Sequence, residues 1–140
     1  MGVAWRSLIY LCSVQPLTLS VVPGVFAICR LDASAPIPDW AGASSFLSIT
    51  RTRDELSIVC PQDDVPEQVL SDKGWRCLRV EGPLDLSLIG VLASLTAPLA
   101  QAGIGVFAIS TYDTDYVLVK AKNLERAILV LLEAGHQTRR

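Results

Sequence analysis

The order of apolar patterns in residues 75–135 constrains the fold of this chain more than any other feature. An alternating, strand-like stretch at 75–80 is followed by a long helical pattern at 86–102. Two further strand-like stretches then flank a polar turn, and an amphipathic helical pattern at 124–134 ends at Gly135. Strand, helix, strand, strand and helix in this order make up most of a ferredoxin-like unit. The sequence therefore predicts an α+β unit with an antiparallel sheet and its helices on one face.

The long helical pattern supplies the apolar face of this unit. Leucines and one isoleucine recur at steps of three and four residues, as they do on one side of a helix: Leu88, Ile89, Leu92, Leu95 and Leu99. Asp85 is suited to an N-cap, and Gly103 to the residue after the C-terminus. Pro98 lies inside the pattern, where it removes a backbone hydrogen bond and is expected to bend the helix.

The first half of the chain repeats the same order in reduced form. It predicts two strands around a Pro23-Gly24 turn, one helical turn, a charged hairpin and a short helix capped by Asp64, at 17–22, 25–31, 38–40, 46–60 and 64–70. The two hairpins overlay at a constant offset of 60, which matches Ile49 with Ile109 and Glu55 with Asp115. We therefore expect two ferredoxin-like units packed side by side, at 17–74 and 75–140, because each would be marginally stable alone.

Composition excludes several functional classes. Hydrophobic residues make up 51% of the chain and charged residues 19%, with a net charge of -2, so no basic face for nucleic acid is expected. His136 is the only histidine, which leaves no partner for a Cys–His catalytic pair or a histidine metal site. Three of the four cysteines, Cys29, Cys60 and Cys77, lie in apolar runs, as reduced core cysteines do.

Residues 1–16 are predicted to be a poorly ordered N-terminal extension. Their apolar run, Ser7 to Val14, is too short to cross a membrane. It also follows a single arginine and precedes no clear cleavage site, so it makes a poor signal peptide. A cytoplasmic protein without a membrane segment is the expectation, and a secretory signal is the alternative.

The polar tip of the second hairpin is a candidate binding site. Thr111, Asp113, Thr114 and Asp115 offer hydroxyl and carboxylate acceptors for an ammonium group. The turn at 81–85 precedes the long helix, and a helix start offers free N–H groups to a carboxylate. A free amino acid carries both groups. The alternative is that Asp113 and Thr114 only form a polar turn, because turns use the same residues.

An enzymatic role has weaker support. Asp113 and Asp115 are two residues apart, so a paired-carboxylate acid–base site is conceivable. The sequence has no phosphate-binding loop, no nucleophile elbow and no metal motif beside them. We therefore expect a protein that is not an enzyme and needs no cofactor and no metal.

Two groups of motifs resemble the ACT family of small amino-acid-sensing domains. The first is Leu86 to Ala93 followed by Ala102 to Val106, and the second is the pair of hairpin segments 55–60 and 109–119. The second group is similar to the ACT units of CASTOR-type cytosolic arginine sensors and of small tandem-ACT proteins. The resemblance covers about residues 17 to 137. It implies a tandem pair of ACT units in a regulatory protein that senses a ligand allosterically.

The resemblance also implies where a ligand would bind. In the sensors it lies between ACT units, against the first-helix turn and the end of the hairpin strand, which here correspond to Ile89, Gly90, Val91, Thr111, Tyr112, Thr114 and Asp115. Asp115 is the implied partner of a cationic group. Because the sensors have four units and this chain has two, a homodimer is implied, with a regulated protein partner as a further expectation. Arginine specificity does not transfer, and the first unit, with Arg51 and Arg53 at its tip, is left open as a binder.

A second function is compatible with the same fold. A degenerate ligand site would leave a structural or partner-binding ACT-like protein, indifferent to changes at the hairpin tip. The sequence identifies neither the amino acid nor the partner.

Overall fold

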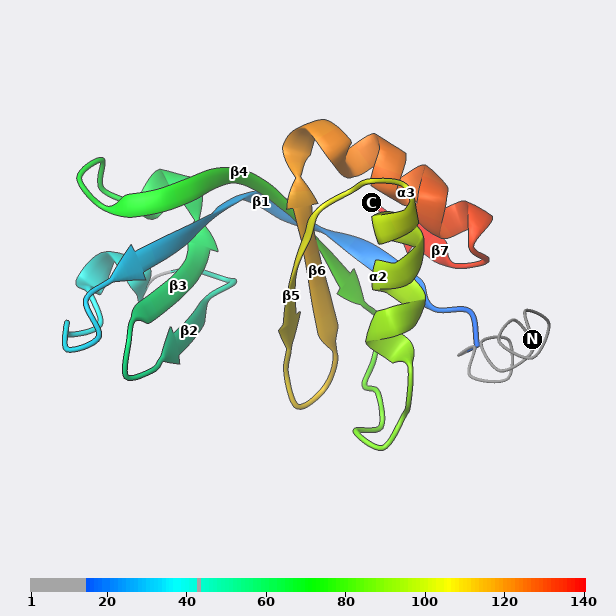
Figure 1. Ribbon diagram of the computed structural model, residues 1–140, viewed down its shortest axis with the longest axis horizontal. Coiled ribbons are helices and arrows are strands. Elements are labelled where there is room, and N and C mark those ends of the chain that lie inside the picture. Colours follow the sequence, from blue (N-terminus) through cyan, green and yellow to red (C-terminus); the bar gives the residue numbers. More distant parts are fainter. Residues whose placement is uncertain (1–14, 43) are drawn as a thin grey trace, which may run out of the picture. The chain divides into compact units, whose positions relative to one another are not determined.

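The computed structural model describes residues 15–42 and 44–140, so the apolar run of the predicted extension lies outside the described residues (Figure 1). The described chain is a mixed α/β structure in which the residues up to Val22 and Leu78–Arg140 form one compact unit. Pro23–Cys77 forms the other. Two long strands, β1 (Thr18–Leu31) and β4 (Leu70–Val80), contribute to both units. The compact units are therefore not two consecutive segments.

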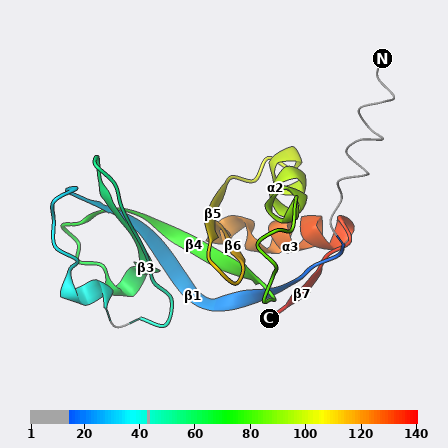
Figure 2. The same ribbon diagram turned by 90° about the horizontal axis from the view of Figure 1, so that it is seen from below.

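The unit that contains the C-terminus carries both α-helices found among the described residues. Its elements besides the strand ends are α2 (Val91–Gln101), β5 (Val106–Ser110), β6 (Asp115–Lys120), η3 (Ala121–Asn123), α3 (Leu124–Glu133) and β7 (Gln137–Arg139). The strands β5 and β6 form the predicted antiparallel hairpin, in which Ser110 pairs with Asp115. Both helices lie on one side of the strands of this unit (Figure 2), as predicted.

The core of this unit lies between its helices and strands. α3 presents Leu124, Ala127, Ile128 and Leu131 at helical spacing, and all four are buried. α2 buries Val91, Leu95 and Leu99 in the same way. Apart from Val91, these side chains share one cluster with strand residues such as Leu78, Val80 and Val117. Burial of this apolar surface therefore stabilises the sheet and holds both helices against it.

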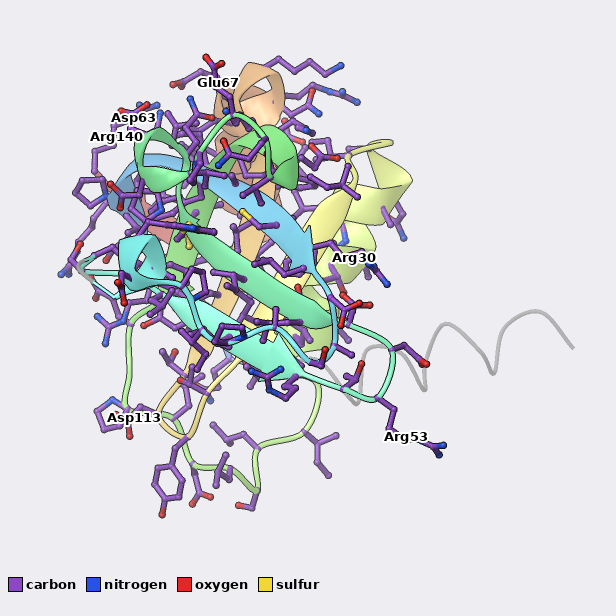
Figure 3. All side chains as sticks on the ribbon, turned by 90° about the vertical axis from the view of Figure 1, so that its left-hand side faces the viewer. Arg30, Arg53, Asp63, Glu67, Asp113 and Arg140 are labelled. Carbon is purple, nitrogen blue, oxygen red and sulfur yellow. The ribbon has the colours of Figure 1, made fainter. Side chains whose placement is uncertain are left out.

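The second unit, Pro23–Cys77, has no α-helix among its described residues. Its strands follow the order β2 (Ser48–Arg51), β3 (Leu56–Pro61), β1 and β4, joined by the short 3-10 helices η1 (Asp39–Ala41) and η2 (Gln62–Asp64). Its core contains Ala27, Cys29, Leu56, Ile58 and Cys60. The charged hairpin predicted at 46–60 is confirmed, and Figure 3 shows Arg53 extending from its tip.

The cysteine prediction is confirmed for the three described cysteines. Cys29, Cys60 and Cys77 are free thiols and all are buried. Burial raises the pKa of the Cys60 and Cys77 thiols to about 12, so both stay protonated at neutral pH. These side chains act as small apolar residues of the core.

The predicted turn at Pro23-Gly24 is wrong. β1 continues through it, and Gly24 takes the left-handed φ of 103° that glycine tolerates. Before this point β1 pairs with β7, from Thr18 onward, and after it β1 pairs with β3, from Phe26 onward. On this side of β1, the partner strand therefore changes from β7 to β3 around Pro23-Gly24.

The short helix predicted at 64–70 is also absent. Val65 precedes Pro66, and the proline ring disfavours helical backbone at the preceding residue. Val65 accordingly has extended angles, φ −86° and ψ 121°, and ends η2. β4 then begins at Leu70, the last residue of the predicted helix.

α2 begins five residues later than predicted, at Val91 rather than Leu86. Asp85 caps a tight turn instead: its carboxylate accepts hydrogen bonds from the N–H and the hydroxyl of Ser87, both at 2.8 Å. Gly90 then takes the N-cap position with a φ of 82°, which is left-handed. The apolar residues Leu86, Leu88 and Ile89 consequently lie in a loop, 67%, 49% and 83% exposed.

One strand was missed in the sequence. The residues after Gly135 form β7, which pairs in parallel with the start of β1. His136 is only 5% exposed, and the N–H of Gln137 donates to the carbonyl of Leu17 at 2.8 Å. A three-residue strand of polar residues carries no apolar alternation, so its pattern gave no signal.

The two hairpins match at an offset of 59, one less than predicted. Leu56, the first residue of β3, corresponds to Asp115 of β6, and Gln62, the first of η2, to Ala121 of η3. The turns agree as well, because the N–H of Thr52 donates to the Glu55 carbonyl and that of Thr111 to the Thr114 carbonyl. A shift of one residue exchanges the two faces of a strand, so this correction changes which side chains correspond.

Candidate functional site

A pocket of about 400 Å³ lies in the unit that contains the C-terminus. One wall is the loop before α2 with the first turn of the helix, and the other is the tip of the β5–β6 hairpin. Fourteen residues line it: Leu84, Asp85, Leu86, Leu88, Gly90, Val91, Leu92, Ala93, Ser110, Thr111, Tyr112, Asp113, Thr114 and Asp115. Its size falls in the range of small-molecule sites.

The first turn of α2 offers hydrogen-bond donors to this pocket. The first helical bond runs from the N–H of Ser94 to the carbonyl of Gly90. The N–H groups of Val91, Leu92 and Ala93 therefore have no acceptor within the helix. All three residues line the pocket, and the positive end of the helix dipole favours an anion there.

The loop before α2 is held against the hairpin tip by its backbone. The N–H of Leu84 donates to the carbonyl of Asp113 at 2.7 Å. Gly82, whose bond to Pro83 is cis, allows this approach: a Cβ at this position would lie 3.0 Å from the carbonyl oxygen of Asp113 and 3.0 Å from the Leu84 nitrogen. The Leu84–Asp113 hydrogen bond therefore joins the two walls of the pocket, and the absence of a side chain at Gly82 makes room for it.

Replacing Gly82 with alanine should separate these walls. The added methyl group meets backbone atoms of both segments, so we expect a loss of about 1–3 kcal/mol in the free energy of unfolding. Chemical denaturation followed by circular dichroism measures it. Gly105→Ala is the matched control, because a Cβ at Gly105 meets no atom within 4 Å. Equal stability of the two variants would contradict the close packing at Gly82.

The two threonines of the hairpin turn have structural roles. Thr114 is 3% exposed, and its hydroxyl donates to the carbonyl of Val80 at 2.6 Å. The Thr111 hydroxyl donates to the Thr114 carbonyl at 3.0 Å and lies 3.3 Å from the Thr114 nitrogen. The Thr114 hydroxyl is thus committed to the fold, while Thr111 is exposed beside the pocket.

The charged groups that line the pocket are all acidic. They are Asp85, Asp113 and Asp115, and no lysine, arginine or histidine is among the lining residues. Hydrogen bonds from the backbone and the hydroxyl of Ser87 lower the pKa of the Asp85 carboxyl. Figure 3 shows Asp113 at the tip of the hairpin, pointing away from the strands. In the described part of the chain, no group of three His, Cys, Asp or Glu side chains could hold a metal ion.

Six of the seven residues predicted to contact a ligand line this one pocket: Gly90, Val91, Thr111, Tyr112, Thr114 and Asp115. The seventh, Ile89, is outside the lining and 83% exposed. The lining also includes Leu84, Leu86 and Leu88. Leu84 belongs to the turn at 81–85 that the sequence indicated, whereas Leu86 and Leu88 were missed because the sequence assigned them to a helix. The signal that could have revealed the loop is Gly90, since glycine is poorly suited to a helix interior.

The corresponding place in the Pro23–Cys77 unit is occupied by an arginine. Arg51 matches Ser110 at the offset of 59 defined by the hairpins. Its guanidinium donates to the carbonyl of Ala35 at 2.8 Å and also to that of Ala33. These carbonyls lie in the loop between β1 and η1. This loop corresponds to the one between β4 and α2, which forms a wall of the pocket.

Comparison with known proteins gives two family matches. Residues 70–133 match the ACT domain, and residues 24–68 match a family described as an N-terminal domain. No helix in the described residues is long and apolar enough to cross a bilayer.

A solved structure covers nearly the whole chain. The X-ray structure of protein Atu0741 from Agrobacterium tumefaciens is 42% identical, with a TM-score of 0.85 over 89% of this chain and 93% of that one. The regulatory subunit of aspartate kinase from Thermus thermophilus, in a ligand-free form, is 14% identical, with a TM-score of 0.55 over 87% and 99%. At that identity the likeness concerns the fold alone.

A curated relative is an amino-acid sensor by name. The cytosolic arginine sensor for mTORC1 subunit 1 of Homo sapiens is 31% identical over 107 residues, which are 71% of this chain and 32% of that protein. The chain thus spans about a third of the length of this relative.

Proposed function

The chain belongs to the family of the Agrobacterium protein and carries an ACT domain at residues 70–133, and from this premise we propose that it is a non-catalytic regulator that binds an amino acid. The observation that carries the proposal is the pocket between α2 and the hairpin tip. It combines N–H groups that have no acceptor within the helix with carboxylates in the same pocket lining. An amino acid presents the complementary pair, a carboxylate and an ammonium group.

The ligand carboxylate would bind the N–H groups of Val91, Leu92 and Ala93. Its ammonium group would bind Asp115, with the exposed hydroxyl of Thr111 as a further acceptor. Tyr112 and Gly90 would contribute contact surface, and Thr114 would act indirectly, by holding the turn in shape through Val80. Ile89 would contact a ligand only if the loop moved.

The lining also supports a ligand class. With three carboxylates and no basic side chain in the lining, a cationic side chain is attracted and an anionic one repelled. We expect basic amino acids to bind more tightly than acidic ones. The name of the human relative, an arginine sensor, agrees with this direction.

We also propose that the chain is a tandem of two ferredoxin-like units. The support is the strand order β4, β1, β3, β2 in Pro23–Cys77 and the matching hairpins and 3-10 helices at an offset of 59. The Pro23–Cys77 unit would not bind an amino acid, because the Arg51 guanidinium already occupies the corresponding place. A homodimer would supply four units from two chains. The cytosolic name of the human relative supports a cytoplasmic location.

Thermal shift measurements with each common amino acid test the ligand proposal. We expect stabilisation by one or a few, strongest for basic ones. Asp115→Asn should weaken binding by about ten- to a hundredfold, because a hydrogen bond to a charged group contributes about 1.5–3 kcal/mol. Thr111→Ala should weaken it less.

Thr52→Ala is the matched control for Thr111→Ala. Thr52 lies at the corresponding turn position, and its hydroxyl makes the same local contacts with Glu55. It should affect stability similarly and leave binding unchanged. Absence of a shift with every amino acid, or equal binding by Asp115→Asn, would contradict the proposal.

A second candidate function has its own observation. Leu86, Ile89 and Tyr112, at or next to the mouth of the pocket, are 67%, 83% and 81% exposed. Exposed apolar residues of this size favour a protein-binding surface. If Ile89→Ser abolished binding of a regulated protein while the pocket bound no amino acid, this function would replace the first.

A further inference from the structure

His136 is the only histidine of the chain, and it is buried with hydrogen-bonding partners on both ring nitrogens. Nδ1 accepts from the N–H of Leu17 at 3.1 Å, and Nε2 lies 3.2 Å from the carbonyl oxygen of Ser94. Because a backbone N–H can only donate, Nδ1 carries no proton and Nε2 carries the one proton of a neutral ring. These two contacts therefore specify one tautomer of the neutral imidazole.

A second proton on the ring is incompatible with these contacts. It would have to bind Nδ1, where a ring N–H would then face the N–H of Leu17, and two donors form no hydrogen bond. The positive charge would also lie where the residue is only 5% exposed. An imidazole in water takes up this proton below about pH 6.5. Acid therefore favours a state in which His136 has left its position.

The elements packed around the ring supply no buried counter-ion for a protonated histidine. α2 contains no charged residue, and neither does the part of β1 in this unit, Thr18 to Val22. The charged residues of α3, β7 and the C-terminal position are all exposed: Glu125, Arg126, Glu133, Arg139 and Arg140. Arg139 pairs with Glu81, and Arg140 pairs with Glu125. No carboxylate is buried among the described residues, so none in the core could stabilise the protonated ring.

The neutral ring holds the strand pairing beside it. The N–H of Gln137 donates to the carbonyl of Leu17 at 2.8 Å, and from there β7 pairs with the start of β1. Of the residues that follow α3, His136 is the buried one. If His136 left its position, the amide of Leu17 would lose its acceptor and β7 would lose its buried anchor.

The same ring also contacts the start of α2. It donates to the carbonyl of Ser94, whose N–H donates to the Gly90 carbonyl and whose hydroxyl donates to the Val91 carbonyl at 2.7 Å. Gly90 and Val91 line the pocket between α2 and the hairpin tip. A change at His136 therefore reaches this wall of the pocket through Ser94.

We propose that His136 is a pH-sensitive switch that joins the start of β1 to α2 when neutral and releases both when protonated, so that the released state binds the ligand of the pocket less tightly. The link to the pocket rests on the ligand proposed above. The released state binds one more proton than the closed state. The ratio of released to closed molecules should therefore rise about tenfold from about pH 7.5 to about pH 5.5.

NMR of the ligand-free full chain tests the switch, because a single histidine gives unambiguous imidazole signals. At about pH 7.5 we expect a bare Nδ1 and a protonated Nε2. The hydrogen-exchange protection of the Leu17 and Gln137 amides should fall about tenfold by about pH 5.5, while the amides that join β5 to β6 keep theirs. A protonated Nδ1 at the higher pH, constant protection of Leu17 and Gln137, or an equal loss in the β5–β6 hairpin would overturn the switch.

His136→Gln is the matched control, since glutamine offers an acceptor and a donor but does not titrate. In this variant the protection of Leu17 and Gln137 should be the same at both pH values. A fall as large as in the wild type would overturn the assignment to His136.

Added amino acid tests the link to the pocket. L-arginine or L-lysine, at about one hundred times its dissociation constant, should raise the protection of Leu17 and Gln137 about a hundredfold, because it binds the closed state. Unchanged protection in the presence of a bound amino acid would overturn the link. If neither amino acid binds, the ligand proposal fails, whereas exchange in the ligand-free chain still decides the switch.

Discussion

Replacing His136 with alanine should lower the free energy of unfolding by about 2–4 kcal/mol. The imidazole is 5% exposed and joins two backbone groups. Its Nδ1 accepts a hydrogen bond from the N–H of Leu17 at 3.1 Å, which leaves the proton on Nε2, 3.2 Å from the carbonyl of Ser94. Alanine would leave both groups without a partner inside the protein.

Pro98 explains why the Ser94 carbonyl needs this histidine. In a regular helix the N–H of residue 98 would donate to that carbonyl, but proline has no N–H. Pro98→Ala supplies the missing donor. The loss caused by His136→Ala should therefore be smaller in the Pro98→Ala background, by about 1 kcal/mol.

Urea denaturation of the four proteins in this double-mutant cycle measures the coupling. His136→Gln retains a donor and an acceptor and should recover part of the stability. Strictly additive losses would show that His136 stabilises the fold by packing alone.

Leu95→Ala should lower the free energy of unfolding by about 2–5 kcal/mol, because truncation of a buried leucine removes apolar contacts and leaves a cavity. Leu95 is 0% exposed and packs in the cluster shared by α2, α3 and the strands. Thermal and urea denaturation give the change.

Leu88→Ala is the informative control. The sequence predicts Leu88 and Leu95 on one apolar helix face, whereas Leu88 lies before α2 and is 49% exposed. Its truncation should change stability by less than about 0.5 kcal/mol. A loss comparable to that of Leu95→Ala would mean that the helix extends back to Leu86.

Periodicity predicted the elements whose stability depends on their own apolar pattern. α3 has a buried face that recurs at helical spacing, and β3 and β6 are mostly apolar runs with consecutive buried residues. It failed where a backbone restriction outweighed the pattern, as at Val65 before Pro66 and at Gly90 before α2. It also failed for β7, which is held by hydrogen bonds to β1 and not by apolar side chains.

The candidate site was predicted in the same partial way. Turn chemistry and the ACT resemblance together indicated six residues of one pocket. They could not show that the Thr114 hydroxyl is bound to Val80, since this contact joins residues 34 positions apart. Nor could they show that Asp85 belongs to the lining through a loop, because the pattern at Leu86 to Ile89 is also compatible with a helix.

The two long strands have a consequence for synthesis on the ribosome. Pro23–Cys77 is a continuous segment, so it can begin to fold once its last residue has emerged. The first residues of β1 can pair with β7 only after residues 137–139 have been synthesised. The hydrogen bond from the N–H of Leu17 to His136, just before the two strands, joins residues 119 positions apart. Until residues 137–139 are made, the amino end of β1 can pair on its β4 side but lacks β7 on the other. Because β7 follows every other described element, it completes the unit that the earliest described residues began.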